Sequence, residues 1–400
     1  MSAHRVVTVI TRLNVGGPVT QAGVVADRLT ARGYATVLVH GALSSGEGDM
    51  SYFIPSSVPR VFVESLRREV SPWNDLKAVW HVYRLLCRER PEVVHTHTAK
   101  AGTVGRLAAV VYNRTVGRRR PAGIAHTYHG HVFEGYFGSL STRIFIAIER
   151  WLARRSEIIV AIAPAVRQDL VETFQVAPAA KVRVVPLGLD LTPFAAVNEA
   201  ARAAARTALG IAPGRLVVST AGRLTDIKRH DLFLEMAARV ARERTDVDFL
   251  IAGDGELRGP LEALAHTLGI SHCVRFLGWR KDLTTIYGAT DVFALTSRNE
   301  GTPVALMEAM ATAVPGVSTD VGGVRDVITG PERGVLVPFG SAEALATPML
   351  QLLADPGGRR RMGDAARADV VARFNLDRLL DNTAALYDDV RSSARSQSRR

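Results

Sequence analysis

Cysteine is scarce in this sequence. Only Cys87 and Cys273 occur among 400 residues, one in each half of the chain. So few cysteines do not provide a disulfide framework, and this composition is typical of proteins that fold in a reducing compartment. We therefore expect a cytoplasmic protein.

Long apolar runs are also absent. The N-terminal run MSAHRVVTVITRLNVGG is short and is broken by Arg12. No window reaches the roughly 18 uncharged apolar residues that a bilayer-spanning helix needs. The sequence therefore predicts neither a signal peptide nor a transmembrane helix, so that any membrane contact would be peripheral, at the inner face.

Two signatures of nucleotide-binding proteins are missing. The chain has no G-x-G-x-x-G fingerprint, which disfavours an NAD-dependent enzyme. It also has no basic helix interleaved with aromatic residues, which disfavours nucleic acid as a partner.

Positive charge, in contrast, is in excess. The formal net charge is +11 at pH 7, a balance that suits phosphate-bearing ligands or anionic lipid surfaces. The last ten residues, RSSARSQSRR, contain no acid and predict a disordered basic tail over 391–400. Two more basic clusters, Arg67-Arg68 and Arg118-Arg120, leave open either contact with an anionic bilayer or a merely Arg-rich surface.

Strand-like and helix-like runs alternate along the chain, which predicts βαβ units and parallel sheets. The predicted strands are 6–11, 36–40, 93–96, 123–128, 158–161 and 182–186, then 216–221, 248–252, 274–277, 292–296, 314–318 and 334–337. We expect an α/β protein with two doubly wound Rossmann-like domains, residues 1–190 and 191–375, with a looser hinge at 191–208. A helix over 376–390 follows them, and a ligand would bind in a central cleft at the carboxyl ends of both sheets.

The stretch 291–313, DVFALTSRNEGTPVALMEAMATA, places Glu300 and Glu308 where a buried strand gives way to a helix. Thr302 suits the N-cap of that helix and Pro303 its first position. The two carboxylates can then hold opposite ends of an elongated ligand, while the free N–H groups of the helix bind a pyrophosphate. A sugar nucleotide has this shape. The alternative is a solvated surface glutamate beside a helix-start glutamate.

This stretch resembles a known family. Glu300-Gly-Thr-Pro-Val-Ala-Leu-Met-Glu308 is similar to the E-x7-E motif of retaining glycosyltransferases of family GT4, and Thr319-Asp-Val-Gly-Gly-Val-Arg-Asp326 resembles the next loop of that family. The resemblance implies a GT-B fold, in which the helix over 376–390 packs back on the first domain, and a catalytic position for Glu300. It also implies that donor contacts come from Gly301, Thr302, Pro303, Val304 and Glu308. One departure is Ala313-Val-Pro-Gly316, where the family more often has a Gly before Val-Pro.

Four other loops match the same family in order, one of them Gly253-Asp-Gly-Glu-Leu-Arg258. Asn14-Val-Gly-Gly-Pro18 coincides with its glycine loop, which implies donor contacts from Gly16 and Gly17. Arg223 and Lys228 fit the pattern G-R-x-x-x-x-K, and their cations can neutralise a leaving pyrophosphate, although a surface basic pair is the commoner meaning of such residues. Phe276-Leu-Gly-Trp-Arg280 resembles the loop that meets the nucleotide base, which implies that Trp279 and Arg280 lie near it.

Two predicted strand ends carry histidines, in VVHTHTAKAG (93–102) and HTYHGHVF (126–133). A metal site built from these histidines lacks a completing carboxylate or cysteine, and the resemblance implies neither metal nor cofactor. The segment around His129 resembles the family segment whose histidine approaches the transferred sugar, which implies a catalytic role. His97, Lys100 and His131 would line the acceptor side.

The resemblance implies transfer of a hexose from a nucleoside-diphosphate sugar, by default a UDP-sugar, to a hydroxyl acceptor with retention of anomeric configuration. The implied setting is bacterial surface polysaccharide or glycolipid synthesis, and a small secondary-metabolite acceptor of the aminoglycoside kind stays open. A sugar-nucleotide epimerase would need acid/base carboxylates that the sequence does not reveal. A noncatalytic basic binding module is the other alternative, and the sequence leaves the oligomeric state open.

Overall fold

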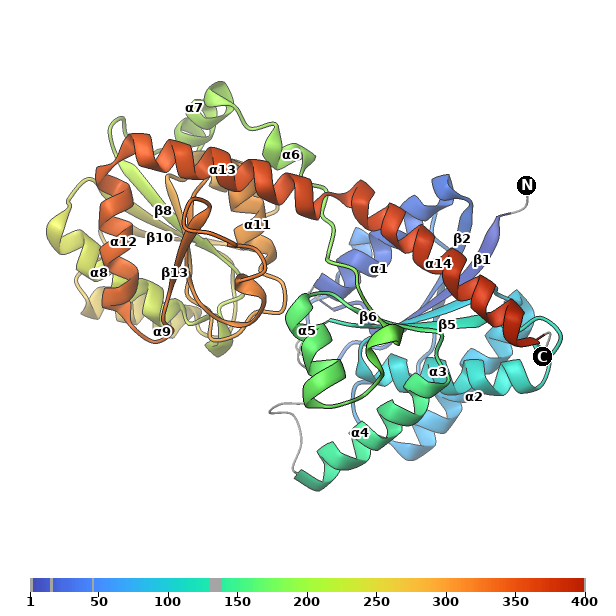
Figure 1. The fold of residues 1–400 in the computed structure, drawn as a ribbon. Helices are drawn as coiled ribbons and strands as arrows, with labels where there is room; N and C mark the ends of the chain where they lie inside the picture. Colours follow the sequence, from blue (N-terminus) through green and yellow to red (C-terminus); the bar gives the residue numbers. More distant parts are fainter. Residues whose placement is uncertain (1–2, 15–16, 45–46, 130–138, 399–400) are drawn as a thin grey trace. The chain divides into compact units, whose positions relative to one another are not determined.

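The computed structural model describes residues 3–14, 17–44, 47–129 and 139–398, and they form two units. The first unit comprises the chain up to Gly188 together with the chain from Leu376 onward, and the second comprises Leu189–Asn375. Each unit is a parallel sheet with helices on both faces (Figure 1). The prediction of two Rossmann-like doubly wound domains is confirmed.

The first sheet has the strand order β3-β2-β1-β4-β5-β6-β7. Its strands are β1 (His4–Arg12), β2 (Tyr34–Gly41), β3 (Arg60–Phe62), β4 (Val93–His97), β5 (Gly123–Tyr128), β6 (Ile158–Ala161) and β7 (Val182–Val184). Its helices are α1 (Gly17–Arg28), α2 (Pro72–Glu89), α3 (Ala99–Arg114), α4 (Ser139–Arg154), α5 (Pro164–Gln168) and α14 (Leu376–Ser398). The order reverses between β1 and β4, so the loops that follow these two strands leave toward opposite faces of the sheet.

The alternation of side chains along the strands builds a core on each face of this sheet. Val7 and Val94 pack with α2 and α3, whereas Val6 and Val93 pack with α1 and α14. The strands are buried on both faces, which explains why they read as continuous runs of Val, Ile and Ala.

The second sheet has the order β10-β9-β8-β11-β12-β13. Its strands are β8 (Leu216–Ala221), β9 (Val247–Ala252), β10 (Val274–Gly278), β11 (Val292–Leu295), β12 (Gly316–Thr319) and β13 (Gly334–Val337). Its helices are α6 (Thr192–Ala195), α7 (Glu199–Ala208), α8 (His230–Glu243), α9 (Arg258–Thr267), α10 (Leu283–Ala289), α11 (Val304–Ala311), α12 (Ala342–Ala354) and α13 (Pro356–Phe374). Here the order reverses between β8 and β11.

The segment expected to be a loose hinge is instead helical and belongs to the second unit. Helix α7 is capped by Asn198, whose side chain accepts a hydrogen bond from the backbone N–H of Ala201. Arg202 and Arg206 donate to the carbonyls of Thr290 and Ala289, so α7 is bonded to the end of α10. The polar, Ala-rich composition that resembled a linker therefore belongs to an amphipathic helix.

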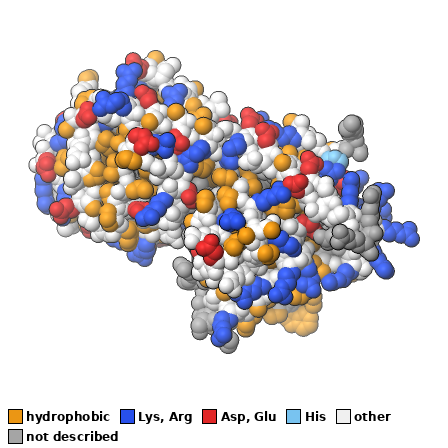
Figure 2. Space-filling model, in the orientation of Figure 1, with side chains coloured by type: hydrophobic (Ala, Val, Ile, Leu, Met, Phe, Trp, Pro, Cys, Tyr) orange, Lys and Arg blue, Asp and Glu red, His pale blue; other side chains and the backbone are white. Residues whose placement is uncertain are grey.

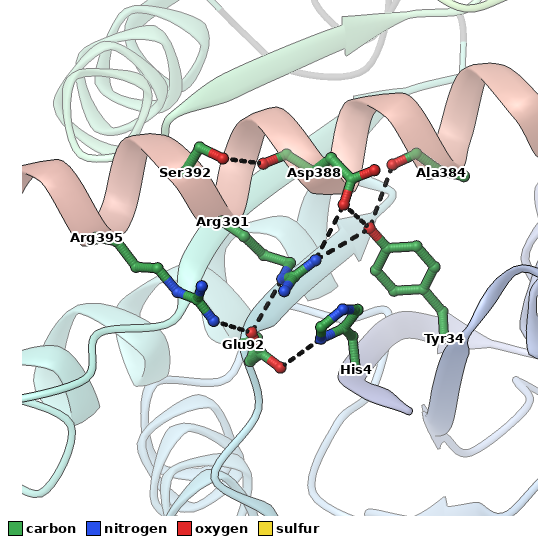
Figure 3. A network of polar contacts seen from close by, with 8 residues as sticks. All are labelled: His4, Tyr34, Glu92, Ala384, Asp388, Arg391, Ser392 and Arg395. Carbon is green, nitrogen blue, oxygen red and sulfur yellow. Dashed lines mark hydrogen bonds and ion pairs between the residues drawn. The ribbon is translucent and has the colours of Figure 1, made fainter. Parts of the chain in front are cut away.

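The expectation of a disordered basic tail from residue 391 is wrong up to Ser398, because these residues continue α14. Arg391 and Arg395 each donate to Oε2 of Glu92, at 3.0 and 2.7 Å (Figure 3). Glu92 also bonds Nδ1 of His4, and Asp388 of the same helix accepts from Tyr34 at 2.6 Å. A long-range partner thus satisfies charges that looked unpaired in the sequence.

Candidate active site

The loops after β8 and β11 meet at the carboxyl edge of the second sheet, where the strand order reverses. Open α/β sheets bind ligands at such a point, because the two loops diverge and leave room between them. The loop after β8 carries Arg223 and Lys228, and the loop after β11 carries Glu300. The predicted pyrophosphate residues are therefore brought together by topology.

Lys228 and Glu300 form an ion pair in this place. The Nζ atom of Lys228 donates to Oε1 of Glu300 at 2.6 Å. The hydroxyl of Ser297 donates to the same oxygen at 2.5 Å. Glu300 is buried, with 7% of its surface exposed, whereas Lys228 is half-buried. The carboxylate is thus fixed from two sides and holds the lysine ammonium at the edge of the sheet.

Backbone contacts tie the two loops into one structure. The hydroxyl of Thr296 donates to the carbonyls of Lys228 and Arg229, and the N–H of Arg298 donates to the carbonyl of Ile227 at 2.8 Å. The position of Lys228 relative to Glu300 is therefore set by the main chain as well as by the ion pair.

Two glycines in the loop after β12 let a third segment approach Glu300. Gly322 has φ +49, and a Cβ added there would lie 2.1 Å from the carbonyl oxygen of Glu300. A Cβ on Gly323 would lie 1.9 Å from the carbonyl oxygen of Gly301. The N–H of Gly323 donates to the carbonyl of Glu300 at 2.9 Å. The Gly-Gly of 319–326 is required by this close approach.

Arg223 differs from Lys228 in having no counter-charge. Its side chain is exposed, and within the described part of the chain it has no hydrogen-bond or ion-pair partner. A guanidinium can bind two phosphate oxygens at once. Arg223 is therefore available to an anionic ligand without first breaking a contact.

The glutamate at the other end of the motif lies inside α11. This helix begins at Val304, with Pro303 at the N-cap and no side-chain cap, so the prediction of Thr302 as the N-cap is wrong by one residue. The ring of Pro303 fixes φ near the helical value at −79° while ψ stays at 77°. The N–H of Val304 donates to the carbonyl of Thr302 and that of Met307 to the carbonyl of Pro303. Among the described residues, the N–H groups of Ala305 and Leu306 are therefore the ones left for a ligand.

Glu308 is half-buried on α11 and accepts a hydrogen bond from the hydroxyl of Tyr287 at 3.1 Å. Burial raises the pKa of Glu308 to about 7, and the Tyr287 hydrogen bond lowers it only in part. The carboxyl group therefore changes between its neutral and ionised forms near neutral pH.

Trp279 and Arg280 follow β10. Trp279 is 52% exposed, and Arg280 is engaged by Asp282, its Nε donating to Oδ1 at 2.7 Å. An exposed indole can stack on a base, while the Arg280–Asp282 pair fixes the turn that presents it.

In the first unit, His95 and His97 lie in β4, at the reversal point between β1 and β4, and His129 follows the neighbouring strand β5. Nδ1 of His97 and Nε2 of His129 lie 2.9 Å apart and share a hydrogen bond. His95 contacts Thr127 at 2.7 Å and the hydroxyl of Tyr387, in α14, at 2.9 Å. The rings of His95 and His97 pack against each other, with centroids 4.2 Å apart. His97 and His129 are thus held together by a direct hydrogen bond.

These histidines are neutral at physiological pH. Burial lowers the pKa of His95 and of His129 to about 3 and that of His97 well below its usual value. A neutral pair that shares one proton must adopt complementary tautomers. Among the described residues, no group of three or more His, Cys, Asp or Glu side chains is arranged to hold a metal ion.

Of four further predicted residues, the structure describes Lys100 and Gly17. Lys100 donates to both carboxylate oxygens of Asp75, each at 2.6 Å, so its charge is already paired. Gly17 begins α1, and a Cβ there would meet no atom within 4 Å. Gly16 and His131 lie outside the described residues.

Sequence reasoning missed three partners of the predicted residues. Ser297 and Tyr287 bond the two motif glutamates, and Asp75 pairs with Lys100. Ser297 stands three residues before Glu300 in the same turn and could have been noticed. Tyr287 is 21 positions away from Glu308 along the chain, and no local pattern connects them.

Two family models match most of the chain. Residues 15–193 match the model described as Glycosyltransferase Family 4, and residues 201–369 match that described as Glycosyl transferases group 1. A D-inositol 3-phosphate glycosyltransferase of Corynebacterium urealyticum is 30% identical over 306 residues, 74% of this chain and 71% of that protein. The chain belongs to the GT4 glycosyltransferases.

Another relative of this GT4 glycosyltransferase is the UDP-Gal:alpha-D-GlcNAc-diphosphoundecaprenol alpha-1,3-galactosyltransferase of Escherichia coli. It is 29% identical over 350 residues, covering 86% of this chain and 87% of the relative. Among solved structures, Anabaena HepE in complex with UDP has a TM-score of 0.80 at 18% identity, covering 96% and 99% of the two chains. A Rickettsia africae glycosyltransferase also has a TM-score of 0.80 at 18% identity, covering 98% and 99%. The fold is therefore GT-B.

The enzyme is a glycosyltransferase that acts on nucleotide sugars, and its relatives include bacterial enzymes of glycolipid and polysaccharide synthesis. The epimerase and binding-module alternatives are set aside by this membership. None of the described helices is long and apolar enough to cross a bilayer.

Proposed function

We propose that this enzyme transfers a hexose from a UDP-sugar to a hydroxyl group of a lipid-linked saccharide, with retention of anomeric configuration, at the inner face of a bacterial membrane. The observation that carries the proposal is the fixed Lys228–Glu300 pair with the unpaired Arg223 on the same loop. A departing diphosphate needs preorganised positive charge, and these two cations would supply it.

Each donor group would have a defined contact. Arg223 and Lys228 bind the diphosphate together with the free N–H groups at the start of α11. Glu308 accepts hydrogen bonds from the ribose hydroxyls, and the exposed ring of Trp279 lies against the base. Glu300 holds Lys228 in place and faces the sugar. Because the donor-binding residues sit on strand ends and short loops, little reorganisation accompanies binding.

His129 would contact the transferred sugar, and the hydrogen bond from His97 would fix its ring. Both rings are neutral, so neither competes with Arg223 and Lys228 for the phosphates. No carboxylate of the described site is free to act as a covalent nucleophile, because Glu300 is bonded to Lys228 and Ser297. We therefore favour front-face transfer, in which the leaving phosphate takes the proton of the acceptor hydroxyl.

The acceptor is inferred from the Escherichia coli relative, whose name specifies a GlcNAc linked through diphosphate to undecaprenol and an α-1,3 product. Its alignment covers 86% of this chain and 87% of that relative. A second candidate acceptor is a soluble cyclitol phosphate, because several relatives are named D-inositol 3-phosphate glycosyltransferases.

One experiment separates these possibilities. The enzyme is incubated with radiolabelled UDP-sugars and either a polyprenyl-diphosphate-linked GlcNAc or inositol 3-phosphate, and the product anomer is read by NMR. Label in the lipid fraction with an α-linkage supports the proposal. Label on inositol phosphate supports the second candidate, an inverted anomer contradicts retention, and the absence of both transfer and slow UDP release contradicts the donor class.

A further inference from the structure

The exposed apolar side chains of the first unit are concentrated on one layer of helices. Of the fifteen exposed large hydrophobic residues in the described part of the chain, nine lie between Val70 and Trp151. Helices α2, α3 and α4, which pack side by side on one face of the first sheet, carry most of them. Exposed apolar residues are normal when scattered singly, but a group of them marks a contact surface.

On α2 the apolar residues form a stripe. Trp73, Leu76 and Trp80 follow the spacing i, i+3, i+7, which places them on one side of the helix. Trp73 is 76% exposed and Trp80 56%. The opposite side of α2, with Val82 and Leu86, packs into the core. This helix is therefore apolar toward both the sheet and the solvent.

Helix α4 repeats the pattern with Ile144, Ile148 and Trp151, at i, i+4 and i+7. The single acid in its sequence, Glu149, is fully buried in an ion pair with Arg106 at 2.6 Å. The outer surface of α4 therefore combines a stripe of apolar side chains with exposed arginines and no exposed carboxylate. These arginines are Arg143, Arg150 and Arg154.

Most of the net positive charge of the chain belongs to the same region. Residues 72–154 contain thirteen Lys and Arg but only five Asp and Glu, which gives a net charge of +8 out of +11 for the whole chain. Figure 2 shows Lys and Arg side chains next to hydrophobic ones along the lower edge of the first unit.

We propose that Trp73, Leu76, Trp80, Ile144, Ile148 and Trp151, here called the α2–α4 face, dock on an anionic lipid bilayer. Tryptophan is preferred at membrane–water interfaces, and arginines that flank an apolar stripe bind anionic headgroups while their alkyl stems cover apolar surface. A second copy of the chain is a poor occupant, because two faces of this charge would repel each other.

The inference deepens the proposed function, because a lipid-linked acceptor must be reached at a membrane. It is tested without donor or acceptor, so its failure would be distinguishable from failure of the transfer reaction. Three of the four tryptophans of the chain lie on the α2–α4 face, so the insertion can be followed by fluorescence.

The full chain is mixed with vesicles of phosphatidylcholine alone or of equal parts phosphatidylcholine and phosphatidylglycerol, at low and high salt. Binding is measured by co-sedimentation, and insertion by quenching of tryptophan emission with brominated acyl chains. The variants are Trp73→Glu with Trp80→Glu, and Ile148→Glu. The matched control is Phe62→Glu, an aromatic residue on edge strand β3 that is 57% exposed but lies outside the α2–α4 face.

We expect the affinity for anionic vesicles to exceed that for neutral ones by about tenfold or more and to fall with salt. Both face variants should lose about tenfold in affinity, and the control should bind like the unmodified protein. Circular dichroism shows whether the variants fold. Equal weak binding to both vesicle types, or undiminished binding by the folded face variants, overturns the proposal. Dimers that the face variants abolish would overturn it in favour of self-association.

Discussion

Glu308 combines burial with a titratable group, so its ionisation is linked to the stability of the second unit. Its pKa is about 7 in the folded chain, compared with about 4.3 for an unperturbed glutamate. Between these values the folded state keeps a proton that the unfolded state releases. The free energy of unfolding therefore falls as the pH rises through this window, and it stays lowered above pH 7.

We predict that Glu308→Gln removes this loss of stability at high pH. The variant should be more stable than the unmodified protein at pH 8 by about 1–3 kcal/mol, and nearly equal to it at pH 4.5. Thermal unfolding at both pH values is the measurement. Glu235→Gln, an exposed carboxylate on α8, serves as control and should show no difference between them. A Glu308→Gln effect of the same size at both pH values would contradict the linkage.

Variants of Arg223 and Lys228 distinguish an effect on catalysis from an effect on folding stability. Arg223 is exposed and unpaired within the described residues, so Arg223→Ala should lower kcat by about a hundredfold while leaving the melting temperature unchanged. Lys228→Ala should lower kcat similarly but also destabilise, because the buried Glu300 loses its counter-ion. Steady-state kinetics and thermal melts are compared with Arg242→Ala, an exposed arginine on α8. Near-normal turnover of Arg223→Ala would exclude its role.

For single residues, the sequence predicted which ones lie at the ends of the strands better than it predicted their hydrogen-bond and ion-pair partners. The approach of Lys228 to Glu300 follows from loops that flank neighbouring strands, which a βαβ pattern implies. The pairing of Lys100 with Asp75, or of Glu308 with Tyr287, depends on side-chain directions between helices. Hydrophobic periodicity contains no information about such contacts.

A strained residue follows the C-cap of helix α11. Ala313 has φ +58, a left-handed conformation that glycine adopts readily and alanine adopts only at a cost. The family more often has glycine before Val-Pro at this position, and the structure shows why. Alanine in place of the more usual glycine at position 313 thus raises the energy of the local backbone.

We predict that Ala313→Gly raises the free energy of unfolding by about 1 kcal/mol. Chemical denaturation is the measurement. A matched control is Ala311→Gly, inside α11, which should destabilise the protein by a similar amount because its backbone is helical. If both substitutions destabilised the protein, the strain at Ala313 would be excluded.

Helix α14 depends on its arginines. Arg391 is only 10% exposed, bonds Glu92 and Asp388, and lies over the ring of Tyr34. Arg391→Gln with Arg395→Gln should lower stability by about 1–2 kcal/mol, measured by denaturation of the full chain. Arg360→Gln on α13, where no described residue pairs with the arginine, should have no effect. An unchanged double variant would mean that the apolar side of α14 suffices.

Strands were easier to predict than the elements that depend on distant partners. β5, β6, β8 and β13 have the predicted bounds because short runs of buried apolar residues mark them. β3 is only three residues long, lies at the sheet edge and is mostly exposed, so it carries no such pattern. The end of α14 was mistaken for a tail because its stabilising partner, Glu92, is about 300 positions away.

At the scale of the whole molecule, the residues that we propose to bind the donor are divided unequally between the two units. Arg223, Lys228, Glu300 and Glu308 belong to the second unit, whereas the glycine loop belongs to the first. We predict that UDP alone slows amide exchange at residues 222–228 and 300–308, whereas a UDP-sugar also slows exchange at 17–20. Exchange measured by mass spectrometry, with ADP as the control nucleotide, tests this. Protection by UDP that is confined to the first unit would contradict the assignment.

The first unit is assembled from both ends of the chain. Its apolar cluster includes Leu379, Leu386, Tyr387 and Val390 of α14, packed on strands that are synthesised at the start. On this face of the first sheet, a nascent chain therefore has α1 but lacks α14 until the ribosome has made the whole second unit and α14. During this interval the exposed Val6 and Val93 face invites aggregation or chaperone capture. Premature termination near the C-terminus would thus impair the half of the enzyme that was made first.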